Sequence, residues 1–377
     1  MINLRDLTIK ELEGYFKSIG EQGFRAKQVF EWLSRGVDSF DEMTNLAKDL
    51  RERLKAAETA GEITIGRINI LRKQESKTDG TVKYLFGLED TNGADCESKK
   101  GNVGNAEQSS QLQPAKHGGS IAVESVFMKY KYGNSICVSS QAGCRMGCAF
   151  CASTIGGLTR NLSPGEILMQ VIGAERDTGE KISHIVIMGT GEPFDNYENI
   201  VKFINLAHEP KGLNLSMRNI TVSTCGLAPK ISDFARDLPQ VNLAVSLHAP
   251  NNEIRNRIMP VNKKYPIETL IPECKKYTDE THRRITFEYA LIDGVNDSDE
   301  NAEELARLLH GMLCHVNLIP LNRVSESGFA GSEKPRVQRF LELLENRGIT
   351  ATVRRELGSD IDAACGQLRL NHNANMP

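Results

Sequence analysis

The sequence predicts an α/β fold, a partial (β/α)6-type barrel preceded by a small N-terminal accessory domain of helices and strands. From about residue 121, short apolar runs alternate with segments of helical periodicity, as in repeated βα units with a parallel sheet under helices. Six or so units fit an open barrel better than a closed barrel of eight. Before residue 91, helical patterns and a strand pair form a separate group.

The N-terminal group occupies residues 1–90. Apolar residues recur at helical spacing in three stretches, 7–16, 24–33 and 46–54. Two further stretches, 63–72 and 82–88, predict paired strands around a turn at 77–80. From these residues alone we expect a small accessory module that caps the main domain.

Residues 91–120 have a different composition. Asn, Gly, Ser, Gln and Lys dominate, and Val103 and Leu112 are the only Leu, Ile, Val or aromatic residues. So few apolar side chains cannot bury enough surface to order a segment. The stretch therefore predicts a flexible insertion between the accessory domain and a catalytic domain at 121–377.

The catalytic domain carries the alternating pattern. Its predicted strands are 122–128, 184–188, 219–223, 241–247, 285–291, 315–320 and 349–353, and its main predicted helices are 164–176, 197–207, 266–277, 299–311 and 334–347. Ser163 and Glu166 form a capping box that begins the first helix, with Pro164 at its first position.

Composition indicates an ordinary globular protein. The chain has 377 residues, 40% hydrophobic and 25% charged, with a formal net charge of −3. No apolar run is long enough to span a membrane, and the N-terminus does not read as a signal peptide. We expect a cytoplasmic monomer with reduced cysteines and no membrane partner. The charge does not favour a protein that depends on non-specific phosphate contacts.

Cys144, Cys148 and Cys151 form a C-x3-C-x2-C loop after the strand-like segment 135–139. A [4Fe–4S] cluster normally takes four cysteines, so three leave one iron open to a small molecule. A structural zinc site wants four protein ligands, and Cys137 could supply the fourth. Zinc therefore remains the alternative at this point.

Other polar residues follow the predicted strands. Since parallel strands end at one edge of a sheet, we expect these residues around one barrel mouth: Gly191, Glu192, Ser223, Ser246, His248 and Asn322. Cys365, in a small-residue loop after the last strand, and Cys137 are candidate nucleophiles on that face. We assign Cys225, Cys274 and Cys314 to packing.

These motifs together resemble the RlmN/Cfr family of radical S-adenosylmethionine (SAM) RNA methyltransferases. The resemblance covers nearly the whole chain except the insertion. It rests on the run from Cys137 to Cys151, Gly-Glu-Pro at 191–193, Ser-Leu-His-Ala at 246–249, Asn-Leu-Ile-Pro-Leu-Asn at 317–322 and Asp-Ile-Asp-Ala-Ala-Cys-Gly-Gln-Leu at 360–368.

The resemblance implies a mechanism. Cys365 takes a methyl from one SAM, and a second SAM on the [4Fe–4S] cluster of Cys144, Cys148 and Cys151 gives a 5′-deoxyadenosyl radical that activates this methyl. Cys137 then resolves the enzyme–RNA adduct, and Glu124 matches the family's proton acceptor. The SAM ligands implied are Gly191, Glu192, Ser223, Ser246, Leu247, His248 and Asn322.

The implied substrates are an adenosine of 23S rRNA and the adenosine 3′ of the tRNA anticodon, both methylated at C2. The implied reductant is an electron donor such as flavodoxin or ferredoxin. Methylation at C8, as in Cfr, shares all the catalytic residues and stays open. So does a zinc-stabilised RNA-binding protein without catalysis. The basic pairs at 283–284 and 354–355 are candidate phosphate contacts or surface charges.

Overall fold

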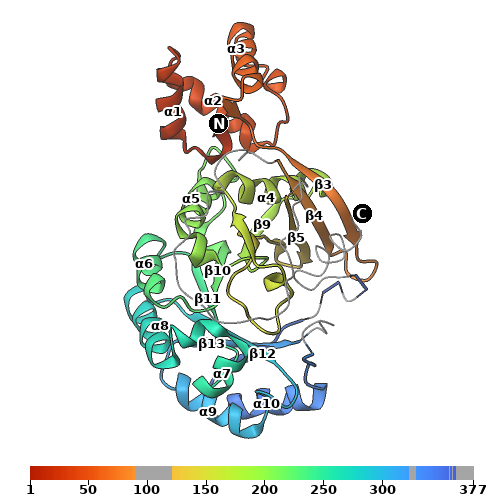
Figure 1. Ribbon diagram of the computed structural model, residues 1–377, viewed down its shortest axis with the longest axis vertical. Helices are drawn as coiled ribbons and strands as arrows, with labels where there is room; N and C mark the ends of the chain where they lie inside the picture. Colours follow the sequence, from red (N-terminus) through yellow and green to blue (C-terminus); the bar gives the residue numbers. More distant parts are fainter. Residues whose placement is uncertain (90–120, 322–327, 356, 359, 362–377) are drawn as a thin grey trace, which may run out of the picture.

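A ten-stranded mixed sheet organises the chain. The computed structural model describes residues 1–89, 121–321, 328–355, 357–358 and 360–361 (Figure 1). The strand order in the sheet is β14-β13-β12-β11-β10-β9-β6-β5-β4-β3, and the strands from β6 to β14 in this order are parallel. The strands are β3 (Ile68–Glu75), β4 (Val82–Leu88), β5 (Ile121–Tyr130), β6 (Gly133–Cys137), β9 (Ile182–Ile187), β10 (Ile220–Thr224), β11 (Asn242–Ser246), β12 (Ile285–Leu291), β13 (Cys314–Pro320) and β14 (Ala351–Val353).

Helices cover the outer side of the parallel strands (Figure 1). They are α4 (Pro164–Thr178), α5 (Tyr197–His208), α6 (Pro229–Asp237), α7 (Asn252–Ile258), α8 (Ile267–Thr281), α9 (Asp299–Leu309) and α10 (Lys334–Asn346). With β6 and β9 to β13 they make six βα units, followed by β14. The predicted partial (β/α)6-type barrel is confirmed. The capping box of Ser163 and Glu166 begins α4, as predicted.

One strand departs from the predicted pattern. Segment 122–128 was expected within the parallel alternation, but β5 runs antiparallel to both β6 and β4. Only two residues separate β5 from β6, and so short a connection allows a hairpin but no parallel crossover.

The accessory strands β3 and β4 continue the same sheet. Leu88 at the end of β4 is the register partner of Ile121 at the start of β5. The sheet therefore runs across the division expected between residues 90 and 121.

Side chains on the parallel strands alternate between two environments. Those facing the helices are apolar and fully buried, as at Val222, Val245 and Phe287. The other face carries polar side chains, and Ser246, Glu288 and Asn317 lie in register across β11, β12 and β13. Because a strand turns successive side chains to opposite faces, this alternation places polar chemistry inside the barrel.

The N-terminal helices are α1 (Ile9–Ser18), α2 (Phe24–Ser34) and α3 (Lys48–Thr59), with a short parallel pair β1 (Ile2–Asn3) and β2 (Ile63–Thr64) beside them. Asp6 joins this group to the barrel, since its Oδ1 accepts from Ser163 Oγ and from the Gly165 N–H, both at 2.7 Å. The beginning of α4 is thus fixed against the N-terminal helices.

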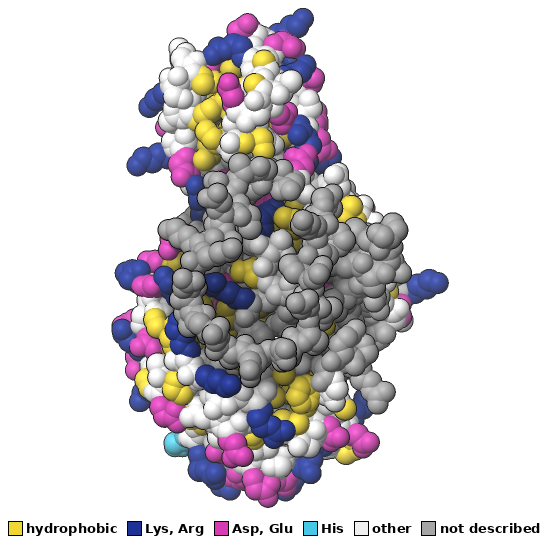
Figure 2. All heavy atoms as spheres, viewed as in Figure 1, with side chains coloured by type: hydrophobic (Ala, Val, Ile, Leu, Met, Phe, Trp, Pro, Cys, Tyr) yellow, Lys and Arg dark blue, Asp and Glu magenta, His cyan; other side chains and the backbone are white. Residues whose placement is uncertain are grey.

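Charged side chains of both signs are mixed over the two ends of the face drawn in Figure 2. This mixture agrees with the small net charge of −3. Within the described residues, no helix is long and apolar enough to cross a membrane.

Candidate active site

The cysteine loop follows β6 and is held by a short antiparallel ribbon, β7 (Gln141–Gly143) with β8 (Leu158–Asn161). The Cys144 N–H donates to the Gly157 carbonyl at 3.0 Å, and the Cys151 N–H donates to the Cys148 carbonyl at 3.1 Å. These bonds fix the loop at the carboxyl end of the first parallel strand.

The loop forms one wall of a cavity of about 270 Å³. The predicted site residues that line it are Cys144, Cys148, Cys151, Gly191, Glu192, Ser223, Ser246 and His248. They come from the cysteine loop and from the ends of three neighbouring strands, β9, β10 and β11, or the turns after them. These residues therefore lie together around one barrel mouth, as the sequence predicts.

Other predicted residues lie elsewhere. The Leu247 side chain belongs to the main core, and its N–H and carbonyl bond to the Glu288 carbonyl and to Arg255. Cys137 and Glu124 are not among the lining residues of this cavity. Asn322 and Cys365 lie outside the described residues.

Glu192 is buried and its carboxylate is held by backbone donors. Oε1 accepts from the Phe194 N–H at 2.9 Å and Oε2 from the Cys225 N–H at 2.7 Å. Burial raises the pKa of Glu192, and these hydrogen bonds partly offset the rise. The carboxylate lines the cavity, and a carboxylate there is an acceptor suited to an ammonium group.

Gly191 is required by the protein's own packing. Its φ is +111°, and a Cβ there would lie 2.6 Å from Gln141 Cβ and 2.7 Å from Ser140 Oγ. The glycine therefore lets the turn after β9 pack directly against β7. The Glu192 N–H in turn donates to Gln141 Oε1 at 2.8 Å.

His248 is neutral in this site. Burial, together with the charge of Arg255, lowers its pKa to about 3. The Ala290 N–H donates to Nδ1 at 2.9 Å, so the ring proton resides on Nε2. The Phe150 ring packs edge-on at 5.0 Å between centroids, which joins His248 to the cysteine loop.

The three thiols form a plausible donor set for a cluster. Burial is the main cause that raises the pKa of Cys144 to about 11 and raises that of Cys148, and neighbouring thiols raise both pKa values further. No three His, Cys, Asp or Glu side chains in the described part of the chain converge on one ion position. A [4Fe–4S] cluster does not need such convergence, since each thiolate binds a different iron.

Cys137 and Glu124 lie on the barrel side of β6 and β5, beside the cavity. Glu124 Oε2 is 3.0 Å from Lys83 Nζ, and their side chains are 3% and 0% exposed. Burial raises the pKa of the Cys137 thiol, while Arg354 and Lys83 act in the opposite direction. Cationic and acidic groups therefore surround the second candidate nucleophile.

Three lining residues were missed or assigned differently from the sequence. Glu288 is a single carboxylate within an apolar strand, and its Oε2 accepts from Asn317 at 2.8 Å. A single acidic residue within an apolar strand is a sequence signal that could have identified Glu288 as a site residue. Arg354, a candidate phosphate contact or surface charge, is exposed but also lines the cavity. Cys225, assigned to packing alone, is buried and also lines it.

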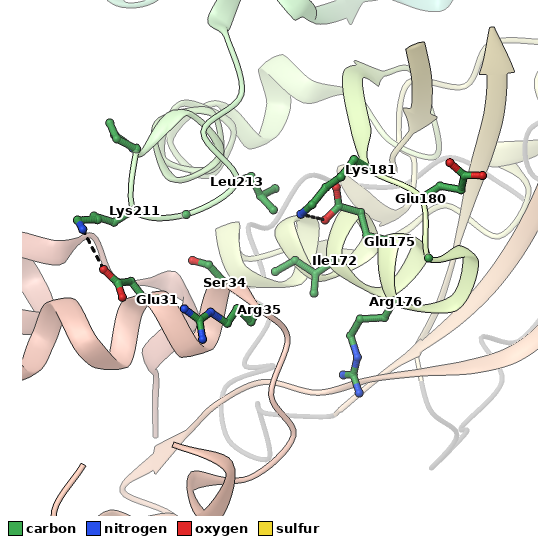
Figure 3. Close-up of a pocket in the computed structure, with 13 residues that line it drawn as sticks. Glu31, Ser34, Arg35, Ile172, Glu175, Arg176, Glu180, Lys181, Lys211 and Leu213 are labelled. Carbon is green, nitrogen blue, oxygen red and sulfur yellow. Dashed lines mark hydrogen bonds and ion pairs between the residues drawn. The ribbon is translucent and has the colours of Figure 1, made fainter. Parts of the chain in front are cut away.

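A larger cavity, about 510 Å³, lies between α2, α4 and residues 210–213 (Figure 3). Ion pairs span its walls, Lys211 to Glu31 at 3.1 Å and Lys181 to Glu175 at 3.2 Å. It adjoins the amino end of β9, the opposite edge from the cysteine loop. In α/β barrels the chemistry lies at the carboxyl ends of strands, so we assign the active site to the smaller cavity.

Comparison with known proteins shows the family of the chain. Residues 2–59 match the ribosomal RNA large subunit methyltransferase N-terminal domain, and residues 138–307 match the radical SAM superfamily. A probable dual-specificity RNA methyltransferase RlmN from Desulforamulus reducens is 50% identical over 375 residues, covering 99% of this chain and 97% of that protein. Another, from Pelotomaculum thermopropionicum, is 52% identical over 370 residues, covering 98% and 91%.

A solved structure, a radical SAM methyltransferase from Sphaerobacter thermophilus, has a TM-score of 0.84 and 44% identity, covering 97% of this chain and 99% of that one. The radical SAM match favours an iron–sulfur cluster over structural zinc at the cysteine loop. The chain therefore belongs to the RlmN family of dual-specificity RNA methyltransferases, radical SAM enzymes that use a [4Fe–4S] cluster and SAM.

Proposed function

We propose that this enzyme methylates C2 of a specific adenosine in 23S rRNA and of the adenosine 3′ of the anticodon in tRNAs. The observation that carries the proposal is the placement of the three-cysteine loop on the same cavity as Glu192, Ser223 and His248. The near full-length similarity to RlmN proteins supports both RNA classes as substrates. We further propose that the enzyme acts in the cytoplasm as a monomer and receives electrons from a flavodoxin- or ferredoxin-type donor.

Cys144, Cys148 and Cys151 would hold the [4Fe–4S] cluster, and SAM would lie against Gly191, Glu192, Ser223, Ser246, Leu247, His248 and Asn322. When bound, cluster and SAM supply a 5′-deoxyadenosyl radical that takes hydrogen from a methyl group. For Leu247 the contact would be through its backbone, because its side chain packs in the core.

Cys365 would accept the methyl that is later transferred. Its thiolate attacks the methyl carbon of a first SAM, the sulfonium C–S bond breaks, and S-adenosylhomocysteine leaves. Radical activation then consumes a second SAM, so two are used per turnover. Adenine C2 carries hydrogen and is electron-poor, so it cannot attack SAM directly. A covalent Cys365–RNA adduct avoids this difficulty.

Glu124 would take the C2 proton when the radical adduct gives up one electron, which the oxidised cluster would accept. Its ion pair with Lys83 requires the carboxylate form, which is the form that accepts a proton. Cys137 would then attack the Cys365 sulfur. The C–S bond to the substrate breaks, its electron pair stays on carbon and takes up a proton, and a Cys137–Cys365 disulfide remains for reduction.

The test is product analysis. The enzyme is reconstituted anaerobically with iron and sulfide, then incubated with SAM, a reductant and either protein-free 23S rRNA or tRNA. Nucleoside digests are compared by mass spectrometry with 2-methyl- and 8-methyladenosine. We expect 2-methyladenosine from both RNAs, its loss in Cys365→Ala, and its retention in Cys314→Ala, a buried cysteine at the start of β13.

Other products would change the proposal. An 8-methyladenosine product would keep the residue roles and move the target atom. Product from one RNA only would remove the dual specificity. A protein that binds zinc, takes up no cluster and yields no methylated adenosine would contradict the enzymatic proposal.

A further inference from the structure

Arg255, on α7, carries a positive charge in the protein interior. Arg255 is 0% exposed, and among the described residues it has the largest side chain that is fully buried. The guanidinium donates to the carbonyls of Leu247, Cys225 and Ser246 at 3.1, 2.7 and 3.2 Å, and to Asn262 Oδ1 at 2.9 Å. Each of these acceptors is neutral.

Neutral acceptors satisfy the N–H groups but do not cancel the charge. Removing an ion from water is costly unless an opposite charge compensates it, and buried cations usually pair with carboxylates. Burial lowers the pKa of the guanidinium, as expected for an uncompensated charge. Two of its acceptors, the carbonyls of Cys225 and Ser246, belong to residues that line the cavity beside the cysteine loop, so the counter-charge is expected on that side.

The cysteine loop packs against the helix that carries Arg255. The Ala149 N–H donates to the Ile258 carbonyl at the end of α7, at 2.9 Å. Cys148 packs with Ile258 and Met259 in one apolar cluster. The cysteine loop therefore lies against the same helix that carries the guanidinium.

The backbone after β10 leaves room for the guanidinium. Gly226 has a φ of +104°, and a Cβ there would lie 3.0 Å from Arg255 Nη2 and from a methyl of Leu270. A side chain at residue 226 would therefore push the charge away from its present place. The ends of β10 and β11, together with helix α7, therefore fix the position of the guanidinium.

We propose that Arg255 is the counter-charge of the iron–sulfur cluster and holds its reduction potential more positive than the thiolates alone would give. The proposal rests on the cluster site of the proposed function. A cluster held by three thiolates gains one further negative charge when an external donor reduces it by one electron. A nearby buried cation therefore favours the reduced form, and net charge around a cluster is a main determinant of its potential. Arg255 is a tuning residue and touches no reacting atom.

The test measures the midpoint potential of the loaded cluster by redox titration with electron paramagnetic resonance, without SAM or RNA. Arg255→Gln removes the charge and keeps some hydrogen bonding. At the wild-type midpoint we expect its reduced-to-oxidised ratio to fall by about tenfold or more, a shift of about 59 mV to more negative potential for a one-electron couple. Arg255→Lys retains the charge and should stay near the wild type.

Arg257→Gln is the matched control, since Arg257 lies on the same helix but is exposed. It removes the same charge in water and should leave the potential unchanged. A purely structural role for Arg255 predicts that Lys and Gln variants lose thermal stability alike and that neither moves the potential. That result would overturn the proposal.

A second variant covers poor folding of Arg255→Gln. Asn262→Asp places a carboxylate on the acceptor of Arg255 and should move the potential in the same negative direction. If the Asn262→Asp protein takes up its cluster and its midpoint potential is unchanged, the role of Arg255 is contradicted but the proposed function is not. Failure of the wild-type protein to take up any cluster contradicts the proposed function as well, so the two failures are distinguishable.

Discussion

Replacing Lys83 with methionine would remove the ammonium group that pairs with Glu124 inside the barrel. The two charges lie 3.0 Å apart, and their side chains are 0% and 3% exposed, so water cannot screen the carboxylate that remains. Breaking such a buried pair from one side costs about 3–5 kcal/mol. Unfolding entropy scales with chain length, so this loss lowers the Tm by about 4–6 °C if the chain unfolds as one unit.

The assay is calorimetry of the cluster-free protein with a surface pair as control. Lys129 lies on β5, as Glu124 does, and pairs with Glu180 at 3.2 Å, but these side chains are 47% and 48% exposed. Exposed pairs contribute about 0–1 kcal/mol, so Lys129→Met should lower the Tm by about 1 °C or less. The two methionine variants differ in environment and share the same chemical change.

A double variant separates the ion pair from packing. Lys83→Met with Glu124→Gln removes both charges, and most of the lost stability should return, since replacing both partners is often nearly neutral. A double variant as unstable as Lys83→Met alone, or a Lys83→Met Tm no lower than that of Lys129→Met, would refute the electrostatic reasoning.

Further predictions concern the site and its anchors. Burial raises the pKa of Cys137, so its alkylation by iodoacetamide in the cluster-free protein should accelerate only above the usual thiol range; rapid labelling at pH 7 would contradict this. The pKa of His248 is about 3 in the folded protein, below its ordinary value of 6.5. The neutral ring therefore stabilises the fold fully above about pH 6.5, and this stabilisation is lost as the pH falls towards 3. Its imidazole proton shifts should therefore stay constant from pH 5 to 8, and a titration there would count against the neutral ring. Gly191→Ala should cost about 1–3 kcal/mol, because φ is +111° and the added Cβ meets β7 at 2.6 Å; an unchanged Tm would show that the turn adapts. Asp79 accepts a hydrogen bond from the Gly358 N–H and so anchors the C-terminal residues. Burial raises the pKa of Asp79, but this bond and those from neighbouring groups lower it to about 2, so the anchor is lost only as the pH falls through about 2. Asp79→Ala should hasten tryptic cleavage of the C-terminal segment, and an unchanged rate would exclude the anchor.

The sequence predicted the fold class and most of the cavity because both depend on local signals. Apolar runs and capping residues located the strands and helices, and strand ends must meet at one edge of a parallel sheet. That rule alone brings Ser223, Ser246 and His248 together with the cysteine loop. The antiparallel direction of β5 was missed because the pattern of an apolar strand does not encode its direction.

The charged residues of the barrel interior were less predictable. Lys83 and Glu124 belong to strands joined through residues 89–120, and only the register of β4 with β5 brings them together. No feature of the sequence distinguishes Arg255 from the other arginines of the chain. Its burial depends on the approach of three separate strand and loop segments, which no local pattern records.

The register between β4 and β5 also makes this enzyme easy to modify. Leu88 and Ile121 are paired across the two strands, so the chain leaves and re-enters the sheet at one place. The entropy cost of joining two such neighbouring ends grows only slowly with the length between them. A short hairpin turn, a fluorescent domain or an immobilisation tag could replace the residues between 89 and 121 and leave the sheet register intact. This strand pair is thus a ready attachment point for following the enzyme on its RNA substrates.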